Sequence, residues 1–472
     1  MENAEENTDL NESLEAAKTN EENSRLSGAA FFFLCFIPVF STIAYGGVDN
    51  WVIGLNSIFC AVLAVLWLAD SWFLKEFRFS ANPMQFSLIG LFLIGIIQLL
   101  PLRSFDNSGN LLNISAVASL SLDSYSTRFF LIQLFGYIIF FAAALVFINN
   151  QKRMQKAVII TIIFGALMAF AGILQRLASP DAIYGIRPTP QAIPFASFVN
   201  QHHFAAFMNM TLGLTLSLLF GKALKKDKSL LLLIAAFLML IAVIFTGSRG
   251  GILSFFGVLA VIFLPLLLHR HFDSEIREQK GKSSFRNKFL ILAGMFAAIF
   301  AIVGAMSFLG GGDSLLRGIG FSGQEDVSSG RTHFWGVALK IFLDHPIFGA
   351  GLNAFGAAFT KYDTWNGTFR IEQAHNDYLQ ILADAGIFGF VCVIAFIYFL
   401  FKKALPHIDS SMSNFRRSSA IGALAGCFGI LIHSFFDFPL RTPSNAFFFL
   451  LFAAIATVTI HQPKSEKKRR RS

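Results

Sequence analysis

Runs of about twenty apolar residues recur along almost the whole length of this 472-residue chain. A helix of that length is just long enough to cross the hydrocarbon core of a bilayer, because each residue advances the helix by about 1.5 Å. About twelve such runs are present, and an even number places both ends of the chain on one side of the membrane. The runs are centred near Phe36, Ala61, Leu93, Ile139, Gly165, Leu212, Ala236, Leu259, Ala298, Ile394, Gly429 and Leu450.

The composition argues against a water-soluble fold. Hydrophobic residues make up 54% of the chain and charged residues only 14%, whereas soluble domains carry about a quarter charged residues. So much apolar surface cannot be buried in one protein core, so lipid must solvate much of it. The sequence therefore predicts an all-α, polytopic transmembrane bundle of about twelve spans. The four cysteines fall inside these spans without metal-ligand spacing, and we expect them to be packing residues.

The basic residues between the spans predict the orientation of the bundle. If the N-terminus is cytoplasmic, most of the 38 Lys and Arg residues fall in the tails and in the loops on that same side, as the positive-inside rule requires. The net charge of +9 then reflects orientation and contact with anionic membrane lipids. We therefore do not expect nucleic acid as a partner.

The expected organisation has five segments. A polar cytoplasmic tail (1–27) precedes nine spans (28–308), a large periplasmic loop (309–386), three further spans (387–461) and a basic cytoplasmic tail (462–472). The large loop is by far the longest connection, and its aromatic residues are spaced as in short amphipathic helices. We expect it to form an ordered helical domain over the bundle, between the ninth and tenth spans.

Two external stretches carry arginines that orientation does not explain. Thr246-Gly-Ser-Arg-Gly-Gly251 joins two apolar runs, so Arg249 lies at the membrane boundary, where a cation needs an anionic partner, water or lipid headgroups. In Gly330-Arg-Thr-His-Phe-Trp335, Arg331 stands at a helix-like start, which suits anion binding. The alternatives are an Arg249 that snorkels to headgroups and an Arg331 that rests on Trp335.

A third stretch, Ala374-His-Asn-Asp-Tyr-Leu379, lies where the large loop re-enters the membrane. His375 stands near a helix start there and could act as a general base at neutral pH, with Asn376 and Asp377 orienting the segment. A lone histidine is, however, more often structural.

Two further external stretches supply supporting polar residues. The stretch 200–204 ends a loop that includes Arg187. The stretch 433–441 fills the last external turn, where Asp437 and Arg441 are spaced for a local salt bridge. The supporting residues expected from these stretches are Arg187, Asn200, His203, His433 and Asp437.

Motifs for nucleotide hydrolysis and for metal binding are not recognisable in the sequence. It contains no Walker-type glycine loop, no His-Glu-x-x-His motif and no pair of cysteines with zinc spacing. We therefore expect no cofactor and no metal, and a donor that is already activated and already in the membrane.

These stretches resemble those of the O-antigen ligase family, which includes surface-polysaccharide ligases, related polysaccharide polymerases and protein O-oligosaccharyltransferases. The likeness covers roughly residues 190–445. The His375 stretch is the most specific, because it fits the ligase pattern through His375, Asn376, Gly386 and Gly389. The other stretches that carry the resemblance are 246–251, 330–335 with 346–351, and 433–439.

The resemblance implies a bacterial inner-membrane enzyme whose active site faces the periplasm. Such an enzyme transfers a glycan from undecaprenyl diphosphate to an acceptor hydroxyl, without ATP or metal. By resemblance, His375 is the general base, and Arg249 and Arg331 bind the diphosphate. The implied partners are the lipid-linked glycan, a lipid A-core or glycan acceptor, and a polysaccharide chain-length regulator.

The sequence leaves two questions open. A lipid A-core acceptor would make the protein a ligase, a second lipid-linked chain would make it a polymerase, and a protein hydroxyl, which the lack of a soluble C-terminal extension disfavours, would make it a protein glycosyltransferase. A transporter or lipid flippase is the alternative from another class. Against it, the two halves show no visible repeat and the spans carry few acidic residues at mid-depth.

Overall fold

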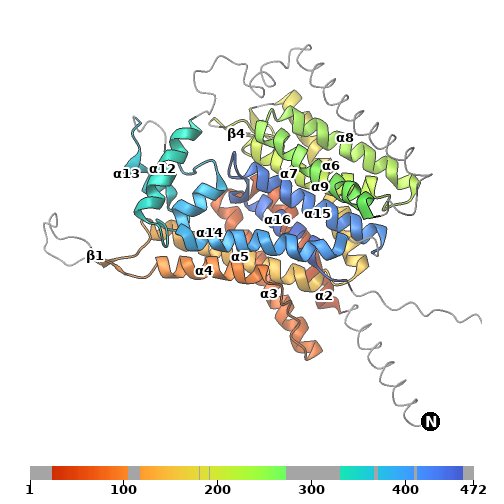
Figure 1. Ribbon diagram of the computed structural model, residues 1–472, viewed down its shortest axis with the longest axis horizontal. Coiled ribbons are helices and arrows are strands. Elements are labelled where there is room, and N and C mark those ends of the chain that lie inside the picture. The colour runs from red at the N-terminus through yellow and green to blue at the C-terminus, as the bar shows by residue number, and fades with distance from the viewer. Residues whose placement is uncertain are drawn as a thin grey trace, which may run out of the picture.

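The computed structural model describes residues 24–104, 117–179, 181–190, 192–272, 330–365, 370–408 and 412–460. These residues are helical almost throughout (Figure 1). Two short antiparallel hairpins interrupt the helices, one formed by β1 (Arg103–Ser104) and β2 (Val117–Ala118), the other by β3 (Ala182–Ile183) and β4 (Arg187–Pro188). The all-α class is therefore confirmed.

The helices of the first part of the chain lead up to residue 272. They are α2 (Arg25–Ile43), η1 (Tyr45–Gly47), α3 (Asn50–Leu74), α4 (Met84–Gln98), α5 (Ser124–Phe147), α6 (Gln151–Ala178), α7 (Gln201–Phe220), α8 (Lys226–Phe245) and α9 (Arg249–Phe272).

The described helices of the second part begin at residue 331. They are α12 (Arg331–Asp344), α13 (Phe355–Tyr362), α14 (Asp377–Ala404), η3 (Leu405–Ile408), α15 (Asn414–His433), η4 (Pro439–Arg441) and α16 (Pro443–Thr457).

Eight of the described helices are long and apolar enough to cross a membrane, namely α2, α3, α5, α6, α7, α8, α14 and α15. Three shorter apolar helical segments, Met84–Gln98, Arg249–Phe263 and Pro443–Thr457, fall on three further predicted runs. The predicted run near Ala298 lies outside the described residues. The chain is thus a membrane protein, and the number of twelve spans stays a prediction.

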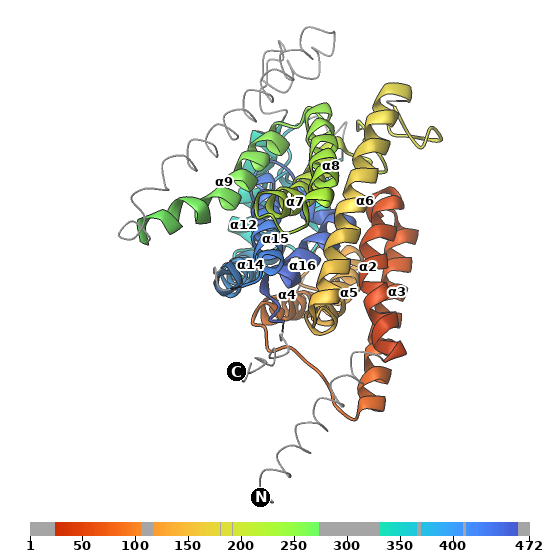
Figure 2. The ribbon, with the colours of Figure 1, turned by 90° about the vertical axis from the view of Figure 1, so that its right-hand side faces the viewer.

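The burial of the helices distinguishes a centre from a periphery. Helix α7 is 89% buried and α15 is 83% buried over their most apolar windows, whereas α3 is only 28% buried. Figure 2 shows α7, α15 and α16 in the middle and α3 at the outside. The outer helices present large apolar side chains such as Trp72, which is 82% exposed. Such an exterior suits lipid rather than water as the solvent.

Helix α14 is broken at Gly386, which has φ 63° and ψ −161°. A Cβ atom at Gly386 would lie 2.4 Å from the carbonyl oxygen of Ile347, and one at Gly349 would lie 2.3 Å from the backbone nitrogen of Ala385. Only glycine permits so close an approach of two backbones. The glycines of two stretches that resemble the ligase family are therefore explained by a packing contact between the loop before α13 and the break in α14.

Backbone hydrogen bonds fasten this loop to α14. Ala350 N–H donates to Ala383 O (2.8 Å), Gly351 N–H donates to Asp384 O (3.0 Å), and Ile387 N–H donates to the oxygen of Pro346 (2.8 Å). The donors and acceptors freed by the helix break are thereby satisfied. The loop consequently has a fixed position on the bundle.

Helices α12 and α13 lie in the described part of the large loop, and they pack beside the start of α14 (Figure 1). Their shared core contains Phe334, Ile341, Phe355 and Phe359. The expected short helices are thus present in residues 330–365. Helix α14 begins at Asp377, so helical structure starts ahead of the expected boundary at residue 386.

Candidate active site

Four helix N-termini converge on the turn between α15 and α16, residues 434–442. Phe334 of α12 stacks on His375, and the backbone N–H of Asp377 donates to the oxygen of Ser434 (2.9 Å). A Cβ atom on Gly250 of α9 would lie 3.2 Å from the ring of His433, and His203 of α7 contacts this turn directly. The positive ends of four helix dipoles therefore face one region, which favours an anionic ligand.

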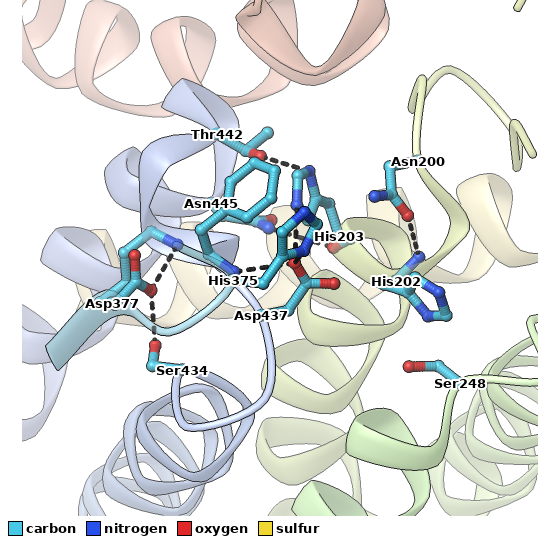
Figure 3. A network of polar contacts seen from close by, with 12 residues as sticks. Asn200, His202, His203, Ser248, His375, Asp377, Ser434, Asp437, Thr442 and Asn445 are labelled. Atoms are coloured by element: carbon cyan, nitrogen blue, oxygen red, sulfur yellow. Dashed lines mark hydrogen bonds and ion pairs between the residues drawn. The ribbon is translucent and has the colours of Figure 1, made fainter. Parts of the chain in front are cut away.

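A carboxylate lies between two histidines in this region (Figure 3). Asp437 Oδ1 is 3.1 Å from His375 Nδ1 and 3.8 Å from His203 Nε2. His203 is held from its other side by Thr442, whose hydroxyl is 2.8 Å from Nδ1. The arrangement joins three segments that are far apart in the sequence.

The charge of Asp437 follows from this environment. Burial would raise the pKa of Asp437, but the contacts with His203 and His375 outweigh burial and hold the pKa well below its usual value. An ionised carboxylate can only accept hydrogen bonds, so His375 Nδ1 must carry the proton in this contact. His375 Nε2 is then left as the nitrogen that can accept a proton from a substrate.

His375 itself is held in an uncommon conformation. Its φ of 51° lies in the left-handed region, which costs free energy for a residue with a side chain. Its ring packs against Phe334 (5.7 Å) and Phe438 (4.8 Å). The side chain is 31% exposed while that of Asp437 is 2% exposed. A substrate can therefore reach the imidazole but not its buried partner.

Asn376 and Asp377 fix the segment that carries His375. Asn376 Oδ1 caps α14 by accepting from the N–H groups of Tyr378 (3.0 Å) and Leu379 (3.1 Å). Asp377 accepts from the hydroxyl of Ser434 (2.8 Å). Both contacts are structural. Asn376 caps the first turn of α14, and Asp377 connects the start of α14 to the turn 434–442.

Asn200 has the same capping role on α7. Its side-chain oxygen accepts from the N–H of His202 (2.8 Å), which orients the first turn of α7. Asn445 of α16 then donates to the oxygen of His203 (3.0 Å). His433 is 1% exposed and borders the same turn.

Both candidate diphosphate-binding arginines begin helices in this region. Arg331 is the first residue of α12, and its charge acts on His202 and His433. Arg249 is the first residue of α9, is exposed, and precedes the glycine that packs on His433. The two arginines thus belong to two of the helices whose N-termini converge.

Arg187 lies in a different environment. Its guanidinium binds both carboxylate oxygens of Asp49 (2.6 and 2.9 Å) and lies over the ring of Tyr45 (4.4 Å). The bidentate contact ties the β3–β4 hairpin to the connection between α2 and α3. None of these contacts involves the histidines of the site.

Residues 234–394 match the model of the family described as O-Antigen ligase. The chain carries an O-antigen ligase domain. This finding confirms the resemblance seen in the sequence, and the matched segment includes Arg249, Arg331 and His375. No curated protein matches the chain.

A buried ion pair beside the site was not predicted from the sequence. Arg441 binds Asp384 of α14 and lies 3.4 Å from Asn353 Oδ1. The local salt bridge expected between Asp437 and Arg441 is therefore wrong. Asp384 is fully buried, so a charge on it requires a cationic partner. Asp437 instead faces His375 and His203. An acidic residue inside the apolar run after His375 was the signal that could have found this pair.

Within the described part of the chain, no group of three or more His, Cys, Asp or Glu side chains is placed to hold a metal ion. His203 and His375 instead both face the carboxylate of Asp437. The arrangement suits proton transfer next to a bound anion.

Proposed function

We propose that this protein is a membrane glycosyltransferase that moves a glycan from undecaprenyl diphosphate to an acceptor hydroxyl on the periplasmic face of the inner membrane. The observation that carries the proposal is the contact between His375 Nδ1 and Asp437 Oδ1 (3.1 Å). It supplies an oriented base beside helix N-termini that suit a diphosphate.

In the proposed reaction, His375 Nε2 accepts the proton of the acceptor hydroxyl. The hydroxyl oxygen forms a bond to the anomeric carbon of the donor sugar, and the bond between that carbon and the diphosphate oxygen breaks. Undecaprenyl diphosphate leaves with the bonding electrons. Asp437 stabilises the imidazolium that forms on His375, as a carboxylate partner does for a catalytic histidine.

The diphosphate must be neutralised because its negative charge grows as it leaves. Arg249 and Arg331 would supply two guanidinium groups, and the N-termini of α9 and α12 would add their dipoles. Fixed cations of this kind need no metal, and the proposed reaction requires no cofactor.

An apolar groove supports a lipid-linked donor. It has a volume of about 580 Å³ and lies between α9 and α15. Its lining includes Leu253, Phe256 and Phe435, and Asn376 and Trp335 also border it. Because Asn376 follows the proposed base, an isoprenoid chain in this groove would place its diphosphate close to His375.

The identity of the acceptor determines whether the proposed enzyme is a ligase or a polymerase. We favour a ligase that uses a lipid A-core or similar surface acceptor, with a polymerase that uses a second lipid-linked glycan as the alternative. A polysaccharide chain-length regulator would be a partner of the polymerase. A transporter or flippase would move a lipid-linked glycan without changing its covalent structure.

The test of the proposed function is transfer by the purified full chain in lipid nanodiscs, supplied with lipid-linked glycan and candidate acceptors. His375→Gln should lower the rate by about 10²–10⁴-fold, because glutamine cannot accept a proton near neutral pH. His345→Gln is the matched control, because His345 ends α12 away from the histidine cluster. Full activity of His375→Gln would exclude His375 as the base, and transbilayer movement without product would indicate a flippase.

A further inference from the structure

Trp365 is much more exposed than the phenylalanines of the core shared by α12 and α13. Phe334, Phe355 and Phe359 are at most 7% exposed, but Trp365 is 49% exposed. One face of its indole is covered, because His333 stacks on it at 4.4 Å with an angle of 8° between the rings. The exposed area therefore belongs mainly to the opposite face and the edge of the indole.

The position of Trp365 is fixed by several contacts. Asp363 Oδ1 accepts from the backbone N–H of Trp365 (3.0 Å) and lies 2.9 Å from His333 Nε2. Gly330 has φ 82°, and a Cβ atom there would lie 2.8 Å from the indole. Because the ring is already ordered, a ligand that stacks on it pays little conformational entropy.

The open indole lies close to the candidate active site. Phe334 contacts Trp365 at 5.6 Å on one side and His375 at 5.7 Å on the other. Trp365 is therefore no more than two ring spacings from the proposed base. Gly330, which lies close to the Cη2 edge of the indole, is followed directly by Arg331. A short run of sugar units would span this distance.

We propose that Trp365 is a glycan-binding subsite, where a pyranose ring of the donor or acceptor stacks on the open indole face. A pyranose presents an apolar face of C–H groups, which suits the negative face of an indole. The carboxylate of Asp363 beside the indole can accept from a sugar hydroxyl. The inference rests on the proposed function, because it places the subsite a short distance along the glycan from the carbon that reacts at His375.

The kinetic test uses Trp365→Ala and Trp365→Tyr with donors and acceptors whose glycans differ in length. For a substrate long enough to reach the subsite, Trp365→Ala should raise KM by about three- to tenfold with kcat nearly unchanged. Substrates with a single sugar should show no change in KM, and Trp365→Tyr should largely restore the KM for long substrates. Trp72→Ala removes a more exposed tryptophan of α3 and serves as the control.

A binding test separates this inference from the proposed function. Soluble oligosaccharide released from the lipid-linked donor is titrated into the full chain in nanodiscs, and its Kd is measured. His375→Gln should bind as the wild type does, and Trp365→Ala should bind about three- to tenfold more weakly. If His375→Gln kept full transfer activity while Trp365→Ala bound the oligosaccharide more weakly, the subsite would stand and only the role of His375 as the base would be excluded.

Three outcomes would overturn the subsite. One is equal loss of activity with short and long substrates in Trp365→Ala, which would indicate a structural role. A second is unchanged KM and Kd. The third is a component of the quenching of wild-type fluorescence by brominated acyl chains that is lost in Trp365→Tyr, because this would place the indole of Trp365 in the lipid headgroup region as a membrane anchor.

Discussion

At the scale of single residues, the site joins an ionised, buried carboxylate to a histidine that a substrate can reach. Of the two histidines that face Asp437, only His375 is within hydrogen-bond distance. His203 Nε2, at 3.8 Å from Asp437 Oδ1, is too distant for a hydrogen bond and interacts with the carboxylate only electrostatically. Asp437 is accordingly a positioning residue for His375 in the proposed reaction.

The pH dependence of stability follows from the low pKa of Asp437. A folded-state pKa below the unfolded value of about 3.9 contributes stability above that value and loses it as the pH falls through the folded pKa. The stability difference between wild type and Asp437→Asn should therefore not shrink between pH 7 and about pH 5, and should shrink only in stronger acid.

This difference can be measured from the thermal unfolding of both proteins with a thiol-reactive dye, because Cys60 and Cys427 are buried and free in the folded chain. In the transfer assay Asp437→Asn should lower the rate by about 100-fold or more at pH 7. A stability difference that already shrinks as the pH falls from 7 to 5 would contradict the assignment of Asp437 as ionised throughout this range.

The two candidate diphosphate arginines can be tested by substitution with lysine, which keeps the charge but loses the guanidinium fork. Arg249→Lys and Arg331→Lys should each lower transfer by about tenfold or more, because hydrogen bonds between charged groups contribute about 1.5–3 kcal/mol. Protein levels should stay close to those of the wild type.

Arg187→Lys is the matched control for this pair. It loses a bidentate contact of the same kind, but to Asp49 and away from the histidines, so transfer should be retained. If both Arg249→Lys and Arg331→Lys also kept full transfer, a diphosphate-binding role for these arginines would be untenable.

At the scale of elements, the contact between the loop before α13 and the break in α14 positions the candidate site. Gly349→Ala would press a methyl group against the backbone of Asp384 and Ala385 and would strain a residue with φ 73°. We expect a loss of about 1–3 kcal/mol in unfolding free energy, visible as a lower Tm. Transfer should fall as well, since α14 carries Asp384 and follows His375.

Gly336→Ala provides the comparison within α12. A Cβ atom at Gly336 meets nothing within 4 Å, so alanine should be neutral or should stabilise the helix by up to about 1 kcal/mol. An equal fall in Tm for Gly336→Ala and Gly349→Ala would mean that the close backbone approach is not what makes Gly349 necessary.

At the scale of the whole molecule, orientation is the property on which the proposed periplasmic reaction depends. The distribution of Lys and Arg predicts that the segment containing Thr364 is periplasmic and that Lys226, the first residue of α8, is cytoplasmic. Both residues are exposed. In cells with a permeabilised outer membrane, Thr364→Cys should react with a membrane-impermeant thiol reagent and Lys226→Cys should not. The reverse pattern would place the site in the cytoplasm.

The class and the family of this protein follow from the sequence because they depend on local properties. The length and apolarity of each run determine whether a helix can sit in lipid, and the long and short apolar helices of the described residues coincide with predicted runs. The stretches around Arg249, Arg331 and His375 are short and contiguous, so their likeness to O-antigen ligases is readable without a fold.

Only the tertiary structure decided which side chains meet. Asp437 faces His375, Arg441 turns to Asp384 of α14, and Arg187 binds Asp49 at a different place. Spacing along the chain favoured Arg441 as the partner of Asp437. The folded turn instead brings Asp437 to two histidines and leaves Arg441 to a fully buried carboxylate. Burial makes an unpaired charge costly, so the packing of the helices, rather than proximity in sequence, selects each partner.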